Sequence, residues 1–160
     1  MTPLQAGPHC ARDALSGAGH ARRVLLVEDS PADARLVRDA LTGNGTALSV
    51  EIATSVEEAL YHLRAGAAEA RLPDLVLLDL HLRDACGFEV LAELKRDERL
   101  RCIPVVVLSS SLSREDVARS YELWANGYVA KPVDLDAFTD AVQVIRSFWL
   151  VTAQLPPAAA

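Results

Sequence analysis

Five side chains that could carry out phosphoryl chemistry directly follow four short apolar runs of the sequence. They are Glu28 and Asp29, Asp79, Ser109, and Lys131. Carboxylates held close together repel one another, so a cation normally has to neutralise them. A set of oxygen ligands selects a hard ion, and Mg²⁺ is the usual one where a phosphoryl group also supplies oxygens. Lys131 could bind one phosphoryl oxygen and Ser109 could donate a hydrogen bond to another, which predicts a phosphoryl-transfer site.

Each of these residues also has an ordinary structural explanation. An Asp at the end of a strand is often a turn former, and Glu28 with Asp29 could simply favour the start of a helix at Ser30. Ser109 opens a run of three serines that is typical of a loop, and a Lys before a Pro is common. The prediction therefore depends on whether the fold brings all five residues to one edge.

Five short segments have the composition of β-strands. They are residues 24–27, 48–52, 75–78, 105–108 and 127–130. The first, third and fourth are continuous apolar runs, which are typical of strands covered by helices on both faces. The second alternates between apolar and polar residues, as an edge strand does. These patterns predict a parallel central sheet.

Helical patterns follow each of the predicted strands. The first begins at Ser30 and Pro31 and has an apolar stripe that ends at Leu41, and the second begins with a capping box of Ser55 and Glu58. The third is indicated by the spacing of Phe88, Leu91 and Leu94, and the fourth begins with a capping box of Ser113 and Asp116. Asp134 can cap the last, which carries Leu135, Phe138, Val142, Ile145 and Trp149. This alternation predicts an α/β fold of the flavodoxin-like kind. We expect a doubly wound sheet of five parallel strands in the order 2-1-3-4-5, flanked by five helices. Ligands of such sheets bind beyond the carboxyl ends of the strands, where the five chemical residues stand.

Length and composition exclude several classes of protein. With 160 residues, 51% apolar and 24% charged, the chain fits one globular domain and not a disordered, collagen-like or cysteine-rich secreted protein. The net charge of -6 has the wrong sign for binding nucleic acid. We expect a poorly ordered arm over residues 1–21, a domain over 22–150 and a tail over 151–160.

The sequence also bears on the cellular compartment. The first 20 residues lack the apolar segment of a signal peptide, and no apolar run is long enough to span a membrane. Cys10, Cys86 and Cys102 are odd in number and form no Cys-x-x-Cys pair, which suits a reducing compartment. We therefore expect a cytoplasmic protein without membrane contact.

The motifs resemble the receiver domain of two-component response regulators, over about residues 22–150. The shared pattern is an acidic pair after the first strand, an Asp after the third with a Gly eight residues on, a hydroxyl after the fourth, and Lys-Pro after the fifth. Here these are Glu28 and Asp29, Asp79 and Gly87, Ser109, and Lys131 and Pro132. The resemblance implies a signalling protein and not an enzyme, apart from its own phosphorylation and dephosphorylation. Asp79 would take a phosphoryl group from a phosphohistidine of a sensor kinase and become an acyl phosphate.

The resemblance implies a bound Mg²⁺ as the cofactor. Asp29, Asp79 and the backbone carbonyl of His81 would ligate the ion directly, and Glu28 would act through water. A metal in this place would screen the charge of the attacking carboxylate.

The resemblance also implies a conformational switch. Lys131 would pair with Asp79 before phosphorylation and hold the phosphoryl group after it, and the peptide bond between Lys131 and Pro132 would be cis. The new charge would draw the Ser109 loop inward. Tyr128 would then swing into the vacated space; its alternative role is that of a packed strand aromatic.

Some positions depart from the family pattern. Many receivers carry a Pro four residues after the nucleophile and an acidic residue before the Gly, and here these are Arg83 and Cys86. The shape of this loop is therefore open. His81 and Ser111 occupy the positions that tune hydrolysis of the acyl phosphate in the family. His81 could orient or obstruct the attacking water, or it could be an inert exposed imidazole.

The segment 65–73, the run 121–124 and the tail resemble receivers that are paired with bacterial phytochrome kinases. This resemblance implies a sensor histidine kinase, a bacteriophytochrome, as partner, and red light as the input. It also implies a homodimer through the fourth helix, fifth strand, fifth helix and the tail. Trp124, Phe148 and Trp149 would be its apolar anchors, unless these aromatics fold back onto their own core.

Two other functions remain open. One is a phosphatase that forms an aspartyl phosphate, although such enzymes usually have a second Asp where this chain has His81. The other is an adaptor that works without phosphorylation and keeps the acidic pocket as a vestige. The complete set of five site residues favours the phosphorylated receiver over both.

Overall fold

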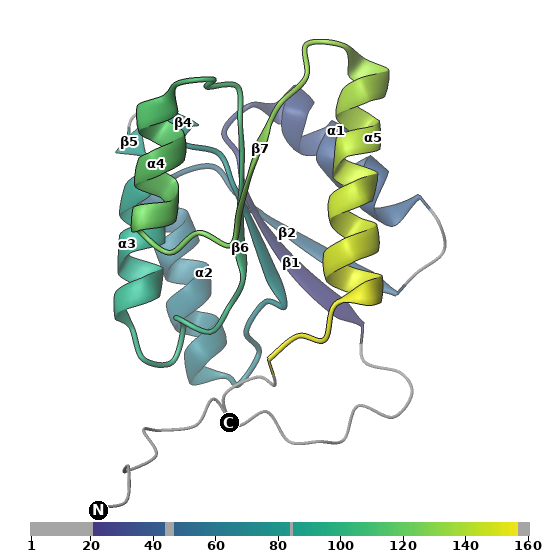
Figure 1. Cartoon of the computed structure of the whole chain (residues 1–160). Coiled ribbons are helices and arrows are strands. Elements are labelled where there is room, and N and C mark those ends of the chain that lie inside the picture. Colours follow the sequence, from purple (N-terminus) through teal and green to yellow (C-terminus); the bar gives the residue numbers. More distant parts are fainter. Residues whose placement is uncertain (1–20, 44–46, 84, 157–160) are drawn as a thin grey trace, which may run out of the picture.

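A parallel sheet of five strands forms the centre of the computed structural model, which describes residues 21–43, 47–83 and 85–156 (Figure 1). Its strands are β1 (Arg22–Val27), β2 (Leu48–Ala53), β3 (Leu75–Leu78), β6 (Val105–Ser109) and β7 (Gly127–Ala130). They lie in the order β2-β1-β3-β6-β7, and every neighbouring pair is parallel. The predicted fold class and strand order are therefore confirmed.

Burial explains why these segments form the centre of the sheet. Every residue of β3 and β6 is buried, as is each of the last four residues of β1, because helices cover both faces. The edge strand β2 has only one buried residue, Ala53, which agrees with its alternating sequence.

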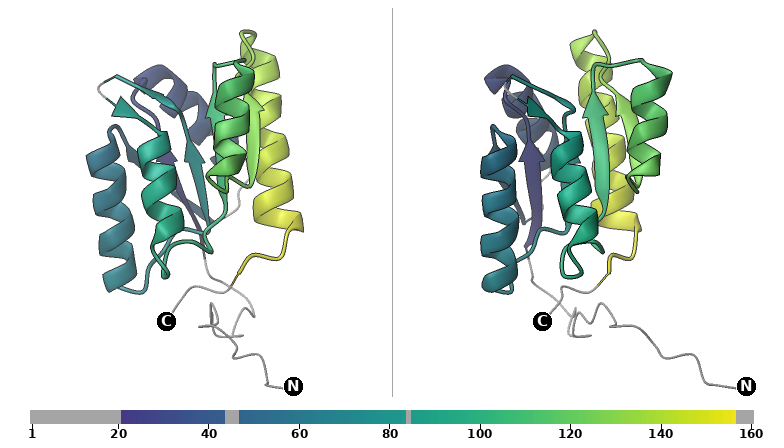
Figure 2. Two further views of the ribbon diagram at one scale, coloured as in Figure 1. Left: turned by 60° about the vertical axis from the view of Figure 1, so that its left-hand side comes forward. Right: turned by 90° about the vertical axis from the view of Figure 1, so that its left-hand side faces the viewer.

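Five α-helices flank the sheet in two layers. They are α1 (Pro31–Thr42), α2 (Val56–Ala68), α3 (Phe88–Arg96), α4 (Arg114–Glu122) and α5 (Leu135–Arg146). Figure 2 shows α1 and α5 together on one face and α2, α3 and α4 on the other. The predicted starts of four helices are confirmed, since their cap side chains each accept the backbone N–H three residues on: Ser30, Ser55, Ser113 and Asp134.

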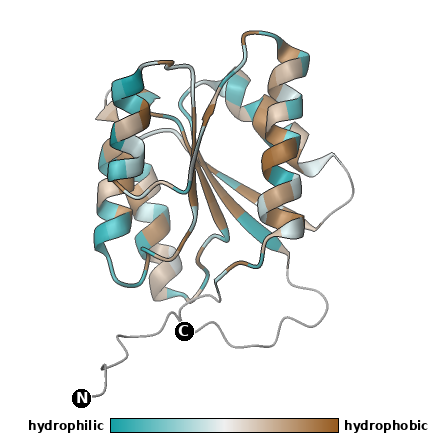
Figure 3. Cartoon of the chain, in the orientation of Figure 1, coloured by the Kyte–Doolittle hydropathy of each residue, from teal (hydrophilic) through white to brown (hydrophobic). Residues whose placement is uncertain are grey.

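Each layer of helices closes its own apolar core. Val37, Leu41 and Phe138 pack with the side chains that β1, β3 and β6 direct toward α1 and α5. Leu63, Leu91 and other side chains of α2 and α3 pack against the opposite face. Figure 3 shows the central strands as mainly apolar, whereas the helices carry both apolar and polar residues. The strand ends are thus held at fixed spacing from both sides.

The chain after α5 continues as a π-helical segment, Ser147–Thr152. The sequence predicted a last helix that reaches Trp149, but it did not predict the change to π-helical geometry after Arg146. Its aromatic residues divide between core and solvent. Trp149 is half-buried against the core beneath α1 and α5, while Phe148 is 53% exposed. Trp124, after α4, is 76% exposed. Folding back onto the core is therefore observed for Trp149 and not for the other two.

Two further features of the described residues differ from expectation. A small antiparallel pair, β4 (His81–Leu82) and β5 (Ala85–Cys86), occupies the loop after β3 and was not predicted. The cis peptide bond expected between Lys131 and Pro132 is wrong, because no described peptide bond is cis. The trans form of such a bond is the more stable by about 0.5–1 kcal/mol, and the Lys131 side chain reaches its partners from it.

No described helix is long and apolar enough to cross a membrane. Residues 1–20 and 157–160 lie outside the described residues, so the predicted N-terminal arm and the end of the tail are not tested.

Gly87 lies where the chain passes closest to the backbone of Asp79. Its N–H donates to the Leu80 carbonyl at 2.9 Å, and a Cβ atom added here would overlap the Asp79 carbonyl oxygen. We expect Gly87→Ala to lower the free energy of unfolding by about 1–3 kcal/mol, as overpacking against fixed backbone does. Urea unfolding measures this change.

Gly127→Ala is the matched control. A Cβ atom there would meet only Val106 at 3.9 Å, an ordinary contact, so the stability should be unchanged or slightly increased. Equal stabilities of the two variants would contradict the close approach at Gly87.

Candidate functional site

The carboxyl ends of β1, β3, β6 and β7 bring the predicted residues to one edge of the sheet, the upper edge in Figure 1. Strand-like hydrogen bonds fix the residues just beyond the strands. The N–H of Glu28 donates to Ala53 at 2.9 Å, that of Asp79 to Val27 at 3.0 Å, and that of Lys131 to Ser109 at 2.8 Å. The sheet therefore fixes the backbone positions of these three residues.

The ammonium of Lys131 is the centre of the site. Its Nζ donates to Glu28 Oε2 at 2.6 Å, to Asp79 Oδ2 at 2.9 Å and to Asp33 Oδ2 at 2.9 Å. The side chains of Lys131, Glu28 and Asp79 are only 8%, 2% and 7% exposed. An ammonium has three donors, so all of them are used by carboxylates.

Burial and pairing act in opposite directions on these groups. Burial disfavours the charged form of Lys131, but hydrogen bonds to Asp79, Glu28 and Asp33 outweigh it and raise its pKa above the ordinary value. For Glu28, burial is the larger effect and raises the pKa, although Lys131 and the Ser30 N–H partly offset it. Lys131 therefore remains charged while it stabilises buried carboxylates.

Asp79 has both carboxylate oxygens engaged. Oδ2 accepts from Lys131, and Oδ1 accepts from the backbone N–H of His81 at 3.0 Å. Asp79 is 6% exposed. A carboxylate buried this far needs hydrogen-bond donors from the protein in place of water, and Lys131 and the His81 N–H supply them.

Asp29 stands apart from the Lys131 cluster. Its Oδ2 accepts from the backbone N–H of Arg83 at 2.8 Å, and the Arg83 side chain lies 4.0 Å away. The departure from the family pattern at Arg83 thus gives Asp29 a partner in the loop after β3. The structure does not place Asp29 in contact with Lys131.

Ser109 and Tyr128 meet through the loop between β6 and α4. Ser109 is fully buried, and its Oγ accepts from the Ser111 N–H at 3.3 Å. The half-buried Tyr128 donates its hydroxyl to the Ser111 carbonyl at 2.8 Å. Ser111 Oγ in turn donates to Asp116 Oδ2 at 2.6 Å. A chain of hydrogen bonds therefore joins the site to the first turn of α4.

His81 lies at the mouth of the site. Its imidazole is 58% exposed, and Nε2 is 3.8 Å from Asp116 Oδ2. The imidazole is thus exposed to solvent and has Asp116, in the first turn of α4, as its neighbour.

The donor set suits a hard divalent cation. Glu28, Asp29 and Asp79 offer carboxylate oxygens, and acidic groups outnumber the single ammonium. Among the described ranges, no three His, Cys, Asp or Glu side chains form a ready-made cage. Several of the carboxylate oxygens accept hydrogen bonds from Lys131 and from the Arg83 N–H. Mg²⁺ typically keeps several waters and needs only one or two carboxylates, so the residues present fit it.

Asp33 is the residue of this site that sequence reasoning missed. Its backbone N–H donates to Ser30 Oγ at 3.3 Å, which fixes it in the first turn of α1. The spacing of Ser30 and Asp33 is itself that of a capping box and could have placed this carboxylate at the same edge.

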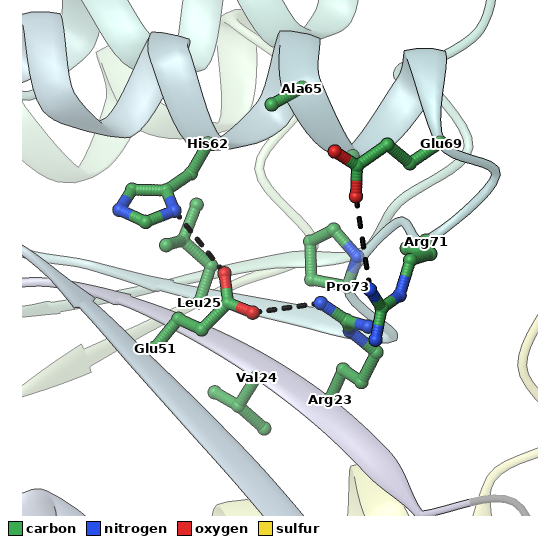
Figure 4. Close-up of a pocket in the computed structure, with 10 residues that line it drawn as sticks. Arg23, Val24, Leu25, Glu51, His62, Ala65, Glu69, Arg71 and Pro73 are labelled. Atoms are coloured by element: carbon green, nitrogen blue, oxygen red, sulfur yellow. Dashed lines mark hydrogen bonds and ion pairs between the residues drawn. The ribbon is translucent and has the colours of Figure 1, made fainter.

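A hollow of about 260 Å³ lies at the other end of β1, away from the Lys131 cluster (Figure 4). Its charged groups pair with one another. Arg23 donates to Glu51 at 2.8 Å, His62 Nδ1 lies 3.3 Å from the same carboxylate, and Arg71 is 3.9 Å from Glu69. This arrangement links β1, β2 and α2 and contains none of the predicted site residues.

Comparison with known proteins decides the family. The family model for the response regulator receiver domain matches residues 24–143. The chain belongs to the response regulator receiver family. It is thus a signalling protein of the two-component type, as the resemblance implied.

The relatives point to one branch of the family. Response regulator Rcp1 from Synechocystis sp. strain PCC 6803 is 43% identical over 147 residues, which are 84% of this chain and 93% of that protein. The solved structure of the phosphorylated cyanobacterial phytochrome response regulator RcpA is 42% identical, with a TM-score of 0.81 over 86% of this chain and 99% of that one. The Mn²⁺-bound form of Rcp1 is 43% identical, with a TM-score of 0.78 over 84% of this chain and 99% of that one. This receiver is therefore related to phytochrome response regulators.

Removal of the central ammonium should destabilise the receiver in a pH-dependent way. In Lys131→Met, Glu28 and Asp79 lose their shared donor, and we expect a loss of about 1–3 kcal/mol in unfolding free energy at pH 7.5. Without Lys131 the folded-state pKa of Glu28 rises further, so the folded protein binds protons more readily than the unfolded chain. The loss should therefore be smaller at pH 5.5.

Urea unfolding at both pH values measures this effect, with Arg35→Met as the control that removes an exposed cation from α1. A deficit that grows as the pH falls, or one equal to that of the control, would contradict the pairing.

Proposed function

We propose that Asp79 is the phosphoacceptor of this receiver and takes a phosphoryl group from a phosphohistidine of a sensor histidine kinase. The observation that carries the proposal is the buried contact between Lys131 and Asp79, with Glu28 and Ser109 at the same edge. A buried carboxylate held by one ammonium is ready to accept a group whose charge that ammonium can hold.

The transfer needs no separate general base. A carboxylate oxygen of Asp79 attacks phosphorus, the bond between phosphorus and the histidine nitrogen breaks, and its electron pair returns to the imidazole. Lys131 and the Ser109 hydroxyl would hold phosphoryl oxygens as an acyl phosphate forms. Catalysis in this reaction consists of positioning and electrostatic stabilisation.

Mg²⁺ is the proposed cofactor. Glu28, Asp29, Asp79 and the His81 carbonyl would hold it, and when bound it neutralises charge between the carboxylates and the phosphoryl oxygens. Asp29 accepts the Arg83 N–H through Oδ2, and its other carboxylate oxygen, Oδ1, would be the one offered to the ion.

The switch proposed here begins at Ser109. A phosphoryl group brings about -1.5 to -2 units of charge and three strong acceptor oxygens. The Ser109 hydroxyl would turn inward and donate a hydrogen bond to one of these oxygens. Its present bond with the Ser111 N–H is long, at 3.3 Å. Movement of this loop would break the bond from Tyr128 to the Ser111 carbonyl and release Tyr128 to swing inward.

A bacteriophytochrome is the proposed kinase. This proposal rests on similarity to RcpA, a cyanobacterial phytochrome response regulator. The input would then be red light.

A homodimer through α4, β7, α5 and the following segment is the proposed output. Trp124, Val144, Phe148 and Val151 are apolar and each more than half exposed. Trp124 also has a φ of 66°, a strained backbone where a helix end usually has Gly. A partner that covers the Trp124 ring would compensate for both the exposure and the strain.

Acetyl phosphate tests the phosphoacceptor directly. We expect addition of one phosphoryl group, seen by intact mass, that requires Mg²⁺ and is lost in Asp79→Asn. The reason is that the amide is a far weaker nucleophile than the carboxylate. No addition with any donor or metal would overturn the proposal and favour an adaptor that works without phosphorylation.

The dimer has its own test. Trp124→Ser combined with Phe148→Ser should weaken self-association at least tenfold, because truncating buried aromatic anchors costs on the order of 2 kcal/mol or more. Sedimentation equilibrium measures the dissociation constant with and without acetyl phosphate. Tyr61→Ser, which removes a 69% exposed aromatic from α2, is the control. Equal association by all three proteins would exclude this face.

A further inference from the structure

Asp33 differs from the other two acceptors of Lys131 in its surroundings. Glu28 and Asp79 are almost fully buried, whereas the Asp33 side chain is 35% exposed. Asp33 also comes from a helix, in the first turn of α1, and not from a strand end. It therefore reaches Lys131 from the solvent side of the cluster.

We propose that Asp33 restrains phosphoryl transfer by acting through Lys131: it occupies one N–H of Lys131 until a phosphoryl oxygen replaces it. The inference rests on the proposed function of Asp79. It adds a competitor to that site: a carboxylate of this chain that holds the lysine where the incoming group must bind.

The three hydrogen bonds of Lys131 explain why one partner must leave. The ammonium has only three donors, and all three are bound to carboxylates at 2.6–2.9 Å. A phosphoryl oxygen can therefore be bound by Lys131 only if one acceptor gives up its bond.

Asp33 is the partner that can leave at least cost. A buried acceptor that loses its donor keeps the full desolvation penalty, which applies to Glu28 at 2% exposure. Asp79 still accepts its N–H from Lys131 while the phosphoryl donor approaches, because its bond to phosphorus has not yet formed. Asp33 can instead be hydrated when Lys131 turns away, because its carboxylate already contacts solvent.

The exchange accompanies a balanced transfer. With acetyl phosphate, a bond forms between an Asp79 oxygen and phosphorus, the donor's bridging P–O bond breaks, and acetate leaves with the electron pair. Lys131 moves its third N–H from Asp33 to a phosphoryl oxygen. The Asp33 charge also repels the anionic donor as it approaches.

Asp33→Asn tests the exchange because it keeps the shape of the side chain and the cap from Ser30. A neutral acceptor holds Lys131 less strongly than a carboxylate does. We expect the rate constant for phosphorylation at low acetyl phosphate to rise about three- to tenfold, through a lower half-saturating concentration. The rate at saturation should change by less than about twofold.

Asp39→Asn is the matched control. It removes the same charge from the same helix, at a side chain that is 62% exposed and pairs with Arg35 at 3.7 Å. Asp33→Glu restores the charge and should return the rate toward that of the unmodified protein. Thermal unfolding of all variants separates an effect on transfer from an effect on stability.

The outcomes are distinguishable. A selective gain in Asp33→Asn, with Asp39→Asn unchanged, supports the exchange. Equal gains in both variants, no gain, or a slower reaction would overturn the inference while the function of Asp79 stands. Failure of the unmodified protein to accept a phosphoryl group with Mg²⁺ would overturn both.

Discussion

One ammonium among carboxylates is the interaction on which the site depends. Lys131, directly after β7, bonds to groups that follow β1 and β3 and to Asp33 on α1. The contact with Glu28 spans 103 positions of the chain, and it depends on the pairing of β1, β3, β6 and β7 side by side. Burial alone would lower the pKa of Lys131, but its carboxylate acceptors raise it. The folded sheet therefore keeps Lys131 charged, and the charged Lys131 in turn stabilises the carboxylates that the sheet buries.

The apolar layers make this polar edge possible. β3 lies in the middle of the sheet with all four residues buried, and Asp79 directly follows it. A side chain fixed on such a strand has little freedom to drift from its partners. The close passage of Gly87 over the Asp79 backbone adds a second constraint from the loop side. Rigid strands therefore set the distances, while loops supply the groups that move.

Sequence patterns predicted the strands and helices whose burial leaves a clear pattern of apolar residues. Buried strands read as continuous apolar runs, so the strand ends and their chemical residues could be placed in advance. The pair β4–β5 has two residues in each strand, too few to show a period. Asp33 was missed because the spacing of Ser30 and Asp33 shows only where α1 begins. The contact with Lys131 depends on the direction in which α1 leaves the sheet, which no local pattern shows. Likewise, nothing local separates Trp149, which packs inward, from the exposed Phe148.

The contrast between α3 and α4 shows where a charge signal can travel. Helix α3 buries Phe88, Val90, Leu91 and Leu94, whereas α4 buries only Ser120. Polar contacts hold α4 instead: Asp116 with Ser111 at 2.6 Å, and Arg119 over the Phe88 ring at 4.4 Å. Shifting α4 would exchange hydrogen bonds and expose little apolar surface, which costs less than moving a core helix. A charge at the proposed phosphoacceptor Asp79 would therefore move α4, beside the exposed Trp124, at less cost than α3, and the hydrogen bonds of Ser109 and Ser111 are the proposed route.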